Sequence, residues 1–126
     1  MKVSAREFKD LASHVRDLGS SLTSAHESEK RSEANRLVRA LQLLNEAEPK
    51  RASLDLQEKR SDSLRIAQAA LSRHFPDERL VLKRFIGGTL EGLLCWELTS
   101  AKFSSGQVVD YPVGGSPYRV ELVTKL

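Results

Sequence analysis

The chain has 126 residues, of which 40% are hydrophobic and 29% are charged, a composition that excludes an intrinsically disordered chain. Its length predicts a single domain over residues 1–126, with a helical part (1–76) followed by a β part (79–126). The 20 lysines and arginines are nearly matched by 17 acidic residues, which gives a net charge of +3. Because the two signs alternate along the sequence, this charge does not indicate a dedicated nucleic-acid-binding protein.

Cysteine content and hydropathy disfavour further classes of protein. A single cysteine, Cys95, excludes an intrachain disulfide and a metal site built from cysteines alone. The first ten residues are rich in charge and lack the apolar region of a secretory signal. No apolar run approaches the about 18 residues that span a bilayer. We therefore expect a cytoplasmic protein that does not enter a membrane.

The first helix is predicted over residues 5–18. Ser4 and Glu7 have the spacing of a capping box, in which each side chain satisfies the backbone amide of the other residue. Val3 and Phe8 occupy the two positions of a hydrophobic staple at the same helix start. Gly19 follows the last apolar residue of the stripe and is a natural helix stop.

The second helix is predicted from about residue 25 to residue 48, because Ser24 and Glu27 repeat the capping-box spacing. Its most apolar run is 34–47, where apolar residues recur every three or four positions and form one wide face. The third helix is predicted over 50–75, either continuous or divided at 61–63. Since Pro49 separates the second and third helices, we expect an antiparallel helical hairpin.

This hairpin predicts an oligomer. Its register places the apolar half of each helix opposite the polar half of its neighbour, so an apolar face of the second helix lacks a partner. The first helix can cover part of that face, and a second copy of the chain, related by a two-fold axis, would cover the rest. The predicted oligomer interface consists of Leu37, Val38, Leu41 and Leu44.

After residue 79 the apolar period changes to that of strands. We expect four strands, over residues 80–86, 93–103, 108–113 and 118–126, separated by short glycine-containing turns. Short turns favour antiparallel neighbours. The predicted fold is therefore α+β, with three helices followed by a four-strand antiparallel meander, and with the third helix packed over Trp96.

No residue pattern indicates an enzyme or a bound cofactor. Asp10, His14 and Asp17 have helical spacing that suits metal ligation, but no fourth ligand is evident, and a solvated helix face is the favoured interpretation. Cys95 lies in the middle of a predicted strand and is interpreted as a packed residue without nucleophilic function.

Two patterns suit an anionic ligand. Lys83, Phe85, Phe103 and Arg119 combine aromatic rings with positive charge on the predicted sheet, a combination that binds nucleotides or single-stranded nucleic acid unless a helix covers that face.

The second pattern lies on the second helix. Arg36 and Arg39, with Lys30 and Arg31 before them, could hold phosphates, although nearby glutamates favour a solvent face laced with ion pairs.

The sequence thus predicts a small non-enzymatic binding protein that acts as a homo-oligomer through its helices, with a protein partner also possible. The alternative is a nucleic-acid or nucleotide-binding protein that uses the basic and aromatic face of its sheet.

Overall fold

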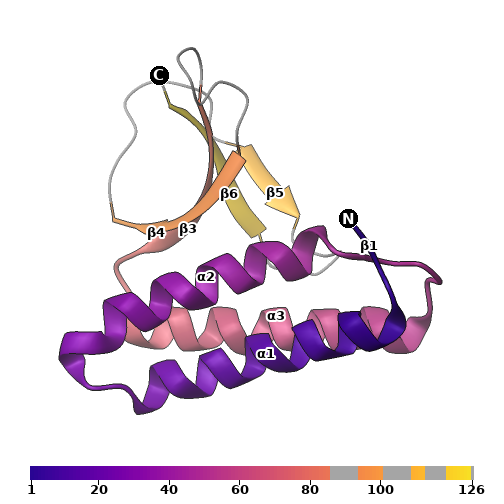
Figure 1. Cartoon of the computed structure of the whole chain (residues 1–126). Helices are drawn as coiled ribbons and strands as arrows, with labels where there is room; N and C mark the ends of the chain where they lie inside the picture. Colours follow the sequence, from indigo (N-terminus) through magenta and orange to yellow (C-terminus); the bar gives the residue numbers. More distant parts are fainter. Residues whose placement is uncertain (86–93, 101–108, 113–118, 126) are drawn as a thin grey trace.

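A computed structural model describes the backbone of residues 1–85, 94–100, 109–112 and 119–125, and the side chains of residues 1–82 and 94–100. Three helices lie side by side beneath a twisted sheet (Figure 1). None of the helices in the described part is long and apolar enough to cross a membrane. The helices are α1 (Ala5–Ser24), α2 (Lys30–Glu46) and α3 (Leu54–His74), with a short 3-10 turn at Glu27–Glu29. The strands are β1 (Lys2–Val3), β2 (Glu48–Pro49), β3 (Arg79–Phe85), β4 (Leu94–Thr99), β5 (Val109–Pro112) and β6 (Arg119–Lys125).

The capping box at the start of α1 is confirmed. The Glu7 amide donates to Ser4 Oγ at 3.1 Å, and the Ser4 amide donates to Glu7 Oε1 at 3.4 Å. Val3 and Phe8 are both buried in the same core, as the hydrophobic staple requires. The first helix therefore starts where the sequence predicts.

The predicted end of α1 is wrong, because the helix continues through Gly19 to Ser24. Leu22 is fully buried and extends the apolar stripe of α1 by another turn, so burial favours the longer helix. Gly19 lies against α3 at Ala67, where the absence of a side chain allows close approach of the two helices.

The other two helices start later than predicted. Because α1 occupies Ser24, the second capping-box pattern is not formed, and α2 begins at Lys30 after the 3-10 turn. Ser53 caps α3 by accepting the Leu56 amide at 3.2 Å. Ser63 does not divide α3, because its buried hydroxyl faces α1 and accepts from Arg16 Nε at 3.2 Å.

The segment after α2 does not form a tight turn. Instead, β2 pairs in parallel with β1, and the Glu48 amide donates to the Met1 carbonyl at 2.7 Å. Lys2 forms an exposed ion pair with Glu48 at 3.1 Å, and this contact lowers the pKa of the Glu48 carboxyl. The N-terminus is thereby attached to the α2–α3 connection.

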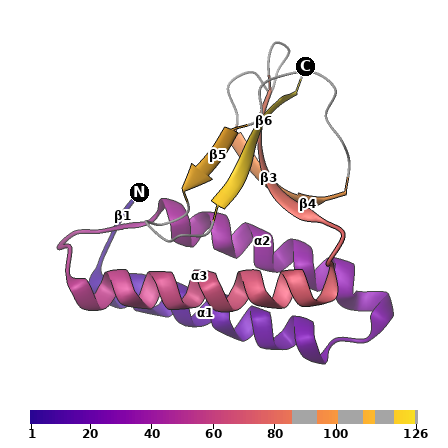
Figure 2. The same cartoon turned by 180° about the vertical axis from the view of Figure 1, so that it is seen from behind.

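As expected, α2 and α3 run antiparallel. Arg60 of α3 contacts the last residues of α2, whereas Lys30 at the start of α2 donates from Nζ to His74 Nδ1 at 3.1 Å. However, α1 packs along both of these helices (Figure 2). The contact between α1 and α3 is more extensive than the contact between α2 and α3. The first helix therefore covers the apolar surface that the hairpin register left without a partner.

This packing changes the interpretation of the predicted oligomer interface. Leu37, Leu41 and Leu44 are 0% exposed and Val38 is 4% exposed in the single chain. Their burial is complete without a second copy, so the apolar face of α2 no longer gives a reason for association. The homo-oligomer stays a prediction, and its interface would have to lie elsewhere on the surface.

The predicted four-strand antiparallel meander is wrong. The strand order is β4-β3-β6-β5, in which β3–β4 and β5–β6 are antiparallel but β3 and β6 are parallel. The sheet thus consists of two antiparallel pairs joined through their inner strands. Turn composition predicts which strands form local pairs, but it does not predict how two such pairs join.

The helix nearest the sheet is α2, and the predicted packing of α3 on Trp96 is therefore also wrong. Trp96 and Leu98 are 8% and 7% exposed and belong to the helical core, so the predicted burial of Trp96 is confirmed. Cys95 is exposed, contrary to the prediction that it packs inside.

One guanidinium joins all three helices. Arg60 of α3 donates from Nη1 to the Asn45 carbonyl at 3.2 Å and from Nη2 to the Ala47 carbonyl at 2.6 Å. These carbonyls lie at the C-terminal end of α2, where the last turn lacks helical partners. The same guanidinium lies 4.9 Å from the centroid of the Phe8 ring on α1, and burial lowers its pKa.

Replacing Gly19 tests the observed length of α1. A Cβ built at Gly19 would lie 3.9 Å from Ala67 Cα, an ordinary van der Waals contact. Because alanine also restricts the unfolded chain, Gly19→Ala should raise the free energy of unfolding by about 0.5–1 kcal/mol. Urea denaturation measures the change. Gly19→Pro is the control and should destabilise the protein by about 3 kcal/mol, because proline inside a helix removes a backbone hydrogen bond and clashes with the preceding turn. A destabilised Gly19→Ala would contradict the helix through this position.

Replacing Arg60 tests the junction of the three helices. Arg60→Met should lower the free energy of unfolding by about 1–3 kcal/mol, because two carbonyls at the end of α2 lose a charged donor. Arg65→Met is the control: Arg65 makes an exposed ion pair with Asp62 at 3.4 Å, so its loss should stay within about 0.5 kcal/mol. Equal losses in the two variants, measured by denaturant titration, would show that the Arg60 contacts do not stabilise the fold.

Candidate anion-binding groove

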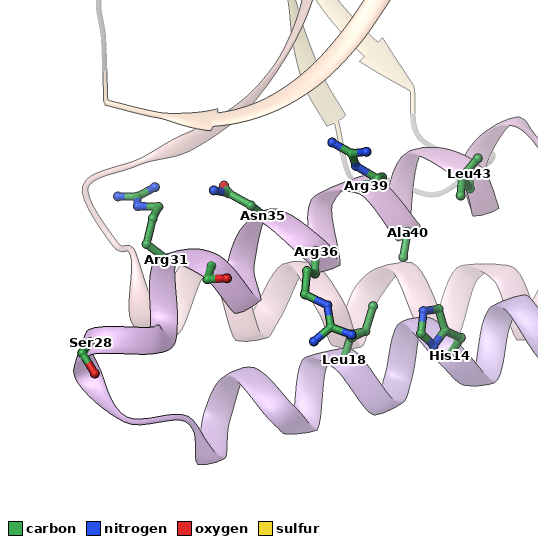
Figure 3. Close-up of a pocket in the computed structure, with 10 residues that line it drawn as sticks. His14, Leu18, Ser28, Arg31, Asn35, Arg36, Arg39, Ala40 and Leu43 are labelled. Carbon is green, nitrogen blue, oxygen red and sulfur yellow. The ribbon is translucent and has the colours of Figure 1, made fainter.

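A groove of about 770 Å³ lies between α1 and α2, and we call it the α1–α2 groove. Figure 3 shows its two sides: His14 and Leu18 project from α1, and Arg36 projects toward them from α2. Arg31 and Arg39 project from α2 toward the sheet. The groove is lined by His14, Leu18, Ser28, Arg31, Ser32, Asn35, Arg36, Arg39, Ala40 and Leu43.

Helical spacing places these residues together. Arg31, Asn35 and Arg39 are four residues apart, so they form a row with one side chain per turn. Leu18 and Ala40 are buried at 6% and 5% exposure and form the apolar base of the groove. The apolar face of α2 packs into the core, and the arginines are therefore held on its outer side.

The three arginines differ in how strongly they are held. Arg31 makes two hydrogen bonds to the Glu78 carboxylate and lies 4.6 Å from the centroid of the Phe75 ring. The bond to Glu78 raises the pKa of Arg31, so this guanidinium is firmly charged and already paired. Its position indicates a structural contact between α2 and the segment after α3.

Arg36 and Arg39 are more available. Arg36 pairs with Glu33 at 3.2 Å along the same helix, and its side chain is 62% exposed. Arg39 is exposed and forms no ion pair with any residue in the described part of the chain. The ion pairing predicted for this face is therefore observed for Arg36 but, among the described residues, not for Arg39.

The lining residues of this groove favour an anion. They include three arginines and a histidine but no carboxylate. A guanidinium presents a planar set of donors that matches carboxylate or phosphate oxygens, and the Asn35 amide and the Ser32 hydroxyl add neutral donors. His14, considered above with Asp10 and Asp17, is thus placed beside arginines. Within the residues that the structure describes, no cluster of three potential metal ligands is found.

A second groove, of about 550 Å³, lies between α2 and β4, and we call it the α2–β4 groove. Asn35, Arg39 and Leu43 line both grooves, so the two are adjacent along the outer side of α2. Leu43 is 44% exposed, which provides an apolar contact beside Arg39. The β4 side is formed by Cys95, Trp96, Glu97 and Leu98.

The side chains of the binding residues predicted on the sheet are not among those that the structure describes. Lys83 and Phe85 lie in β3 and Arg119 lies in β6, the parallel neighbour of β3. Their side chains, and Phe103 altogether, lie outside the described residues. The nucleic-acid or nucleotide site on that face therefore stays a prediction.

Sequence reasoning identified Arg36 and Arg39 but missed the α1 side of their groove. Finding His14 and Leu18 opposite Arg36 requires the register between α1 and α2, which helical periodicity within one element does not contain. The signal that could have helped is the length of α1, because the buried Leu22 shows that the apolar stripe passes Gly19.

Comparison with known proteins adds no assignment: no family model, curated protein or solved structure matches this chain. The two grooves on α2 are consequently the features from which a function can be inferred.

Proposed function

We propose that this protein is a non-enzymatic binding protein that holds an anionic group of its partner in the α1–α2 groove, with Arg39 as the principal contact. The observation that carries the proposal is the guanidinium of Arg39, which pairs with no carboxylate among the described residues and lies in a groove whose described lining contains none. An exposed arginine without a carboxylate partner offers its full set of donors to an incoming carboxylate or phosphate.

The base of the groove supports a partner larger than a single ion. Leu18 and Ala40 provide an apolar base, and Leu43 adds an exposed apolar side chain at the end toward β4. Binding sites of this kind combine apolar area with a few polar groups that set the orientation of the ligand. The partner we propose therefore carries apolar surface next to its negative charge.

The proposal keeps the binding function predicted from the sequence but changes the surface. The apolar residues predicted to form an oligomer interface are buried in the single chain, whereas the polar outer side of α2 is open. A nucleic-acid partner would also supply anions, and it is distinguished from an acidic protein by the experiment below.

Charge reversal of Arg39 tests this function. Arg39→Glu should weaken binding to fluorescein-labelled polyglutamate by about tenfold or more, because one charge-assisted contact becomes a repulsion. Fluorescence anisotropy at low salt measures the affinity, since screening reduces such contacts as the salt concentration rises. A labelled single-stranded oligonucleotide is measured in parallel.

The matched control is Arg73→Glu. Arg73 is an exposed arginine of α3 that lines a different groove, between α1 and α3, so its reversal changes the net charge by the same amount. Far-ultraviolet circular dichroism shows that both variants are folded. Equal weakening by the two variants would mean that anions bind to the overall charge and not to the α1–α2 groove.

A further inference from the structure

We infer that the partner is an extended peptide segment that adds a strand to the outer edge of β4 and places an acidic side chain at Arg39. This inference rests on the proposed function and names the class of its partner. It is carried by a separate observation, the hydrogen bonds between the Gln42 side chain and the backbone of β4.

Strand β4 is the end strand of the sheet in the described order β4-β3-β6-β5. In an antiparallel pair, the amide and carbonyl of one residue point to the same side, and successive residues alternate between the two sides. Gln42 Oε1 accepts from the Trp96 amide at 3.0 Å, and Gln42 Nε2 donates to the Leu94 carbonyl at 3.2 Å. The register with β3 is continuous, so Leu94, Trp96 and Leu98 direct their backbone groups to the outer side.

Gln42 occupies part of this edge. Its side chain donates to the Leu94 carbonyl and accepts from the backbone amide of Trp96, two residues further on. One residue of a neighbouring parallel strand would bond to β4 in the same way. Natural sheets commonly cover an edge in this way to prevent unwanted pairing. Beyond Gln42, the Trp96 carbonyl accepts no hydrogen bond from the described chain outside the sheet, and the Leu98 amide donates none to it.

A groove lies beside these groups in the described part of the chain. The α2–β4 groove lies along Trp96 and Leu98 on one side and along Val38, Arg39 and Leu43 on the other. A peptide strand paired with β4 would have one row of side chains facing α2, where Leu43 offers an apolar contact and Arg39 a positive charge. Addition of a strand to a sheet edge is a common mode of peptide recognition, in which backbone bonds supply affinity and side-chain contacts supply specificity.

The charges of the same groove favour a peptide over a nucleic acid. Glu46 and Glu97 line it together with Arg39, so a continuous row of phosphates would run past carboxylates as well as the arginine. A peptide can place a single carboxylate at Arg39 and neutral side chains beside Glu46 and Glu97. A peptide also has the backbone donors and acceptors that the edge of β4 requires.

The test uses an acetylated heptapeptide with a single glutamate at its centre and valine or threonine at every other position. Trp96 is the one tryptophan of the chain and lines the groove, so its fluorescence reports binding directly. Two further peptides of the same sequence carry N-methyl groups on the odd or on the even residues. Because a strand presents alternate amides to opposite sides, one methylated peptide should lose about tenfold or more in affinity while the other binds like the parent.

Two protein variants complete the test. Arg39→Glu should weaken the parent peptide by about tenfold or more, as the proposed function requires. Gln42→Ala should strengthen it several-fold, because the peptide no longer displaces the Gln42 amide from Leu94 and Trp96. Arg73→Glu serves again as the control for net charge and should leave peptide affinity unchanged.

The outcomes separate this inference from the proposed function. If Arg39→Glu weakens binding but both methylated peptides bind equally, the anion site stands and strand addition is overturned. If the oligonucleotide binds at Arg39 and the heptapeptide does not, the partner is a nucleic acid and strand addition is again overturned. If neither probe depends on Arg39, the proposed function fails as well.

Discussion

The arrangement of the helices depends on the contact between the Arg60 guanidinium and the C-terminal carbonyls of α2. Arg60 belongs to α3, bonds to Asn45 and Ala47, and lies over the Phe8 ring of α1, so one side chain fixes the relative positions of three helices. The end of a helix carries partial negative charge, and a cation stabilises it there. From this fixed end, Gln42 lies about one turn back along α2 and reaches the edge of β4.

The helical period of α2 places its core residues and its candidate binding residues on different faces of the helix. Leu37, Val38, Leu41 and Leu44 face the core and are buried, whereas Asn35, Arg36, Arg39, Gln42 and Leu43 line the outer grooves or contact β4. Because α1 and the sheet lie on either side of α2, each side of its outer surface becomes one wall of a groove. A single helix thus completes the core and presents both candidate binding surfaces, and a change in its rotation would affect both.

Local features of the fold were predictable from the sequence, and long-range pairings were not. The Ser4–Glu7 box and the burial of Trp96 depend on neighbouring residues or on strand alternation, and both are confirmed. The parallel pairing of β3 with β6 and the passage of α1 through Gly19 depend on contacts between distant segments, which override turn and stop signals. The same limit applies to the site: Arg39 was identified, but its position where the two grooves meet comes from tertiary packing.

The three arginines of the α1–α2 groove differ in the order in which an anionic partner can engage them. Arg39 has no carboxylate to give up among the described residues, so it is available at once. Arg36 would exchange Glu33 for the partner, and an exposed pair of this kind is worth at most about 1 kcal/mol. Arg31 is held by two bonds to Glu78 and by the Phe75 ring, so a partner gains little by competing for it. Affinity should therefore depend on the end of the groove nearest β4, where the two grooves share Arg39, while Arg31 keeps α2 attached to the segment after α3.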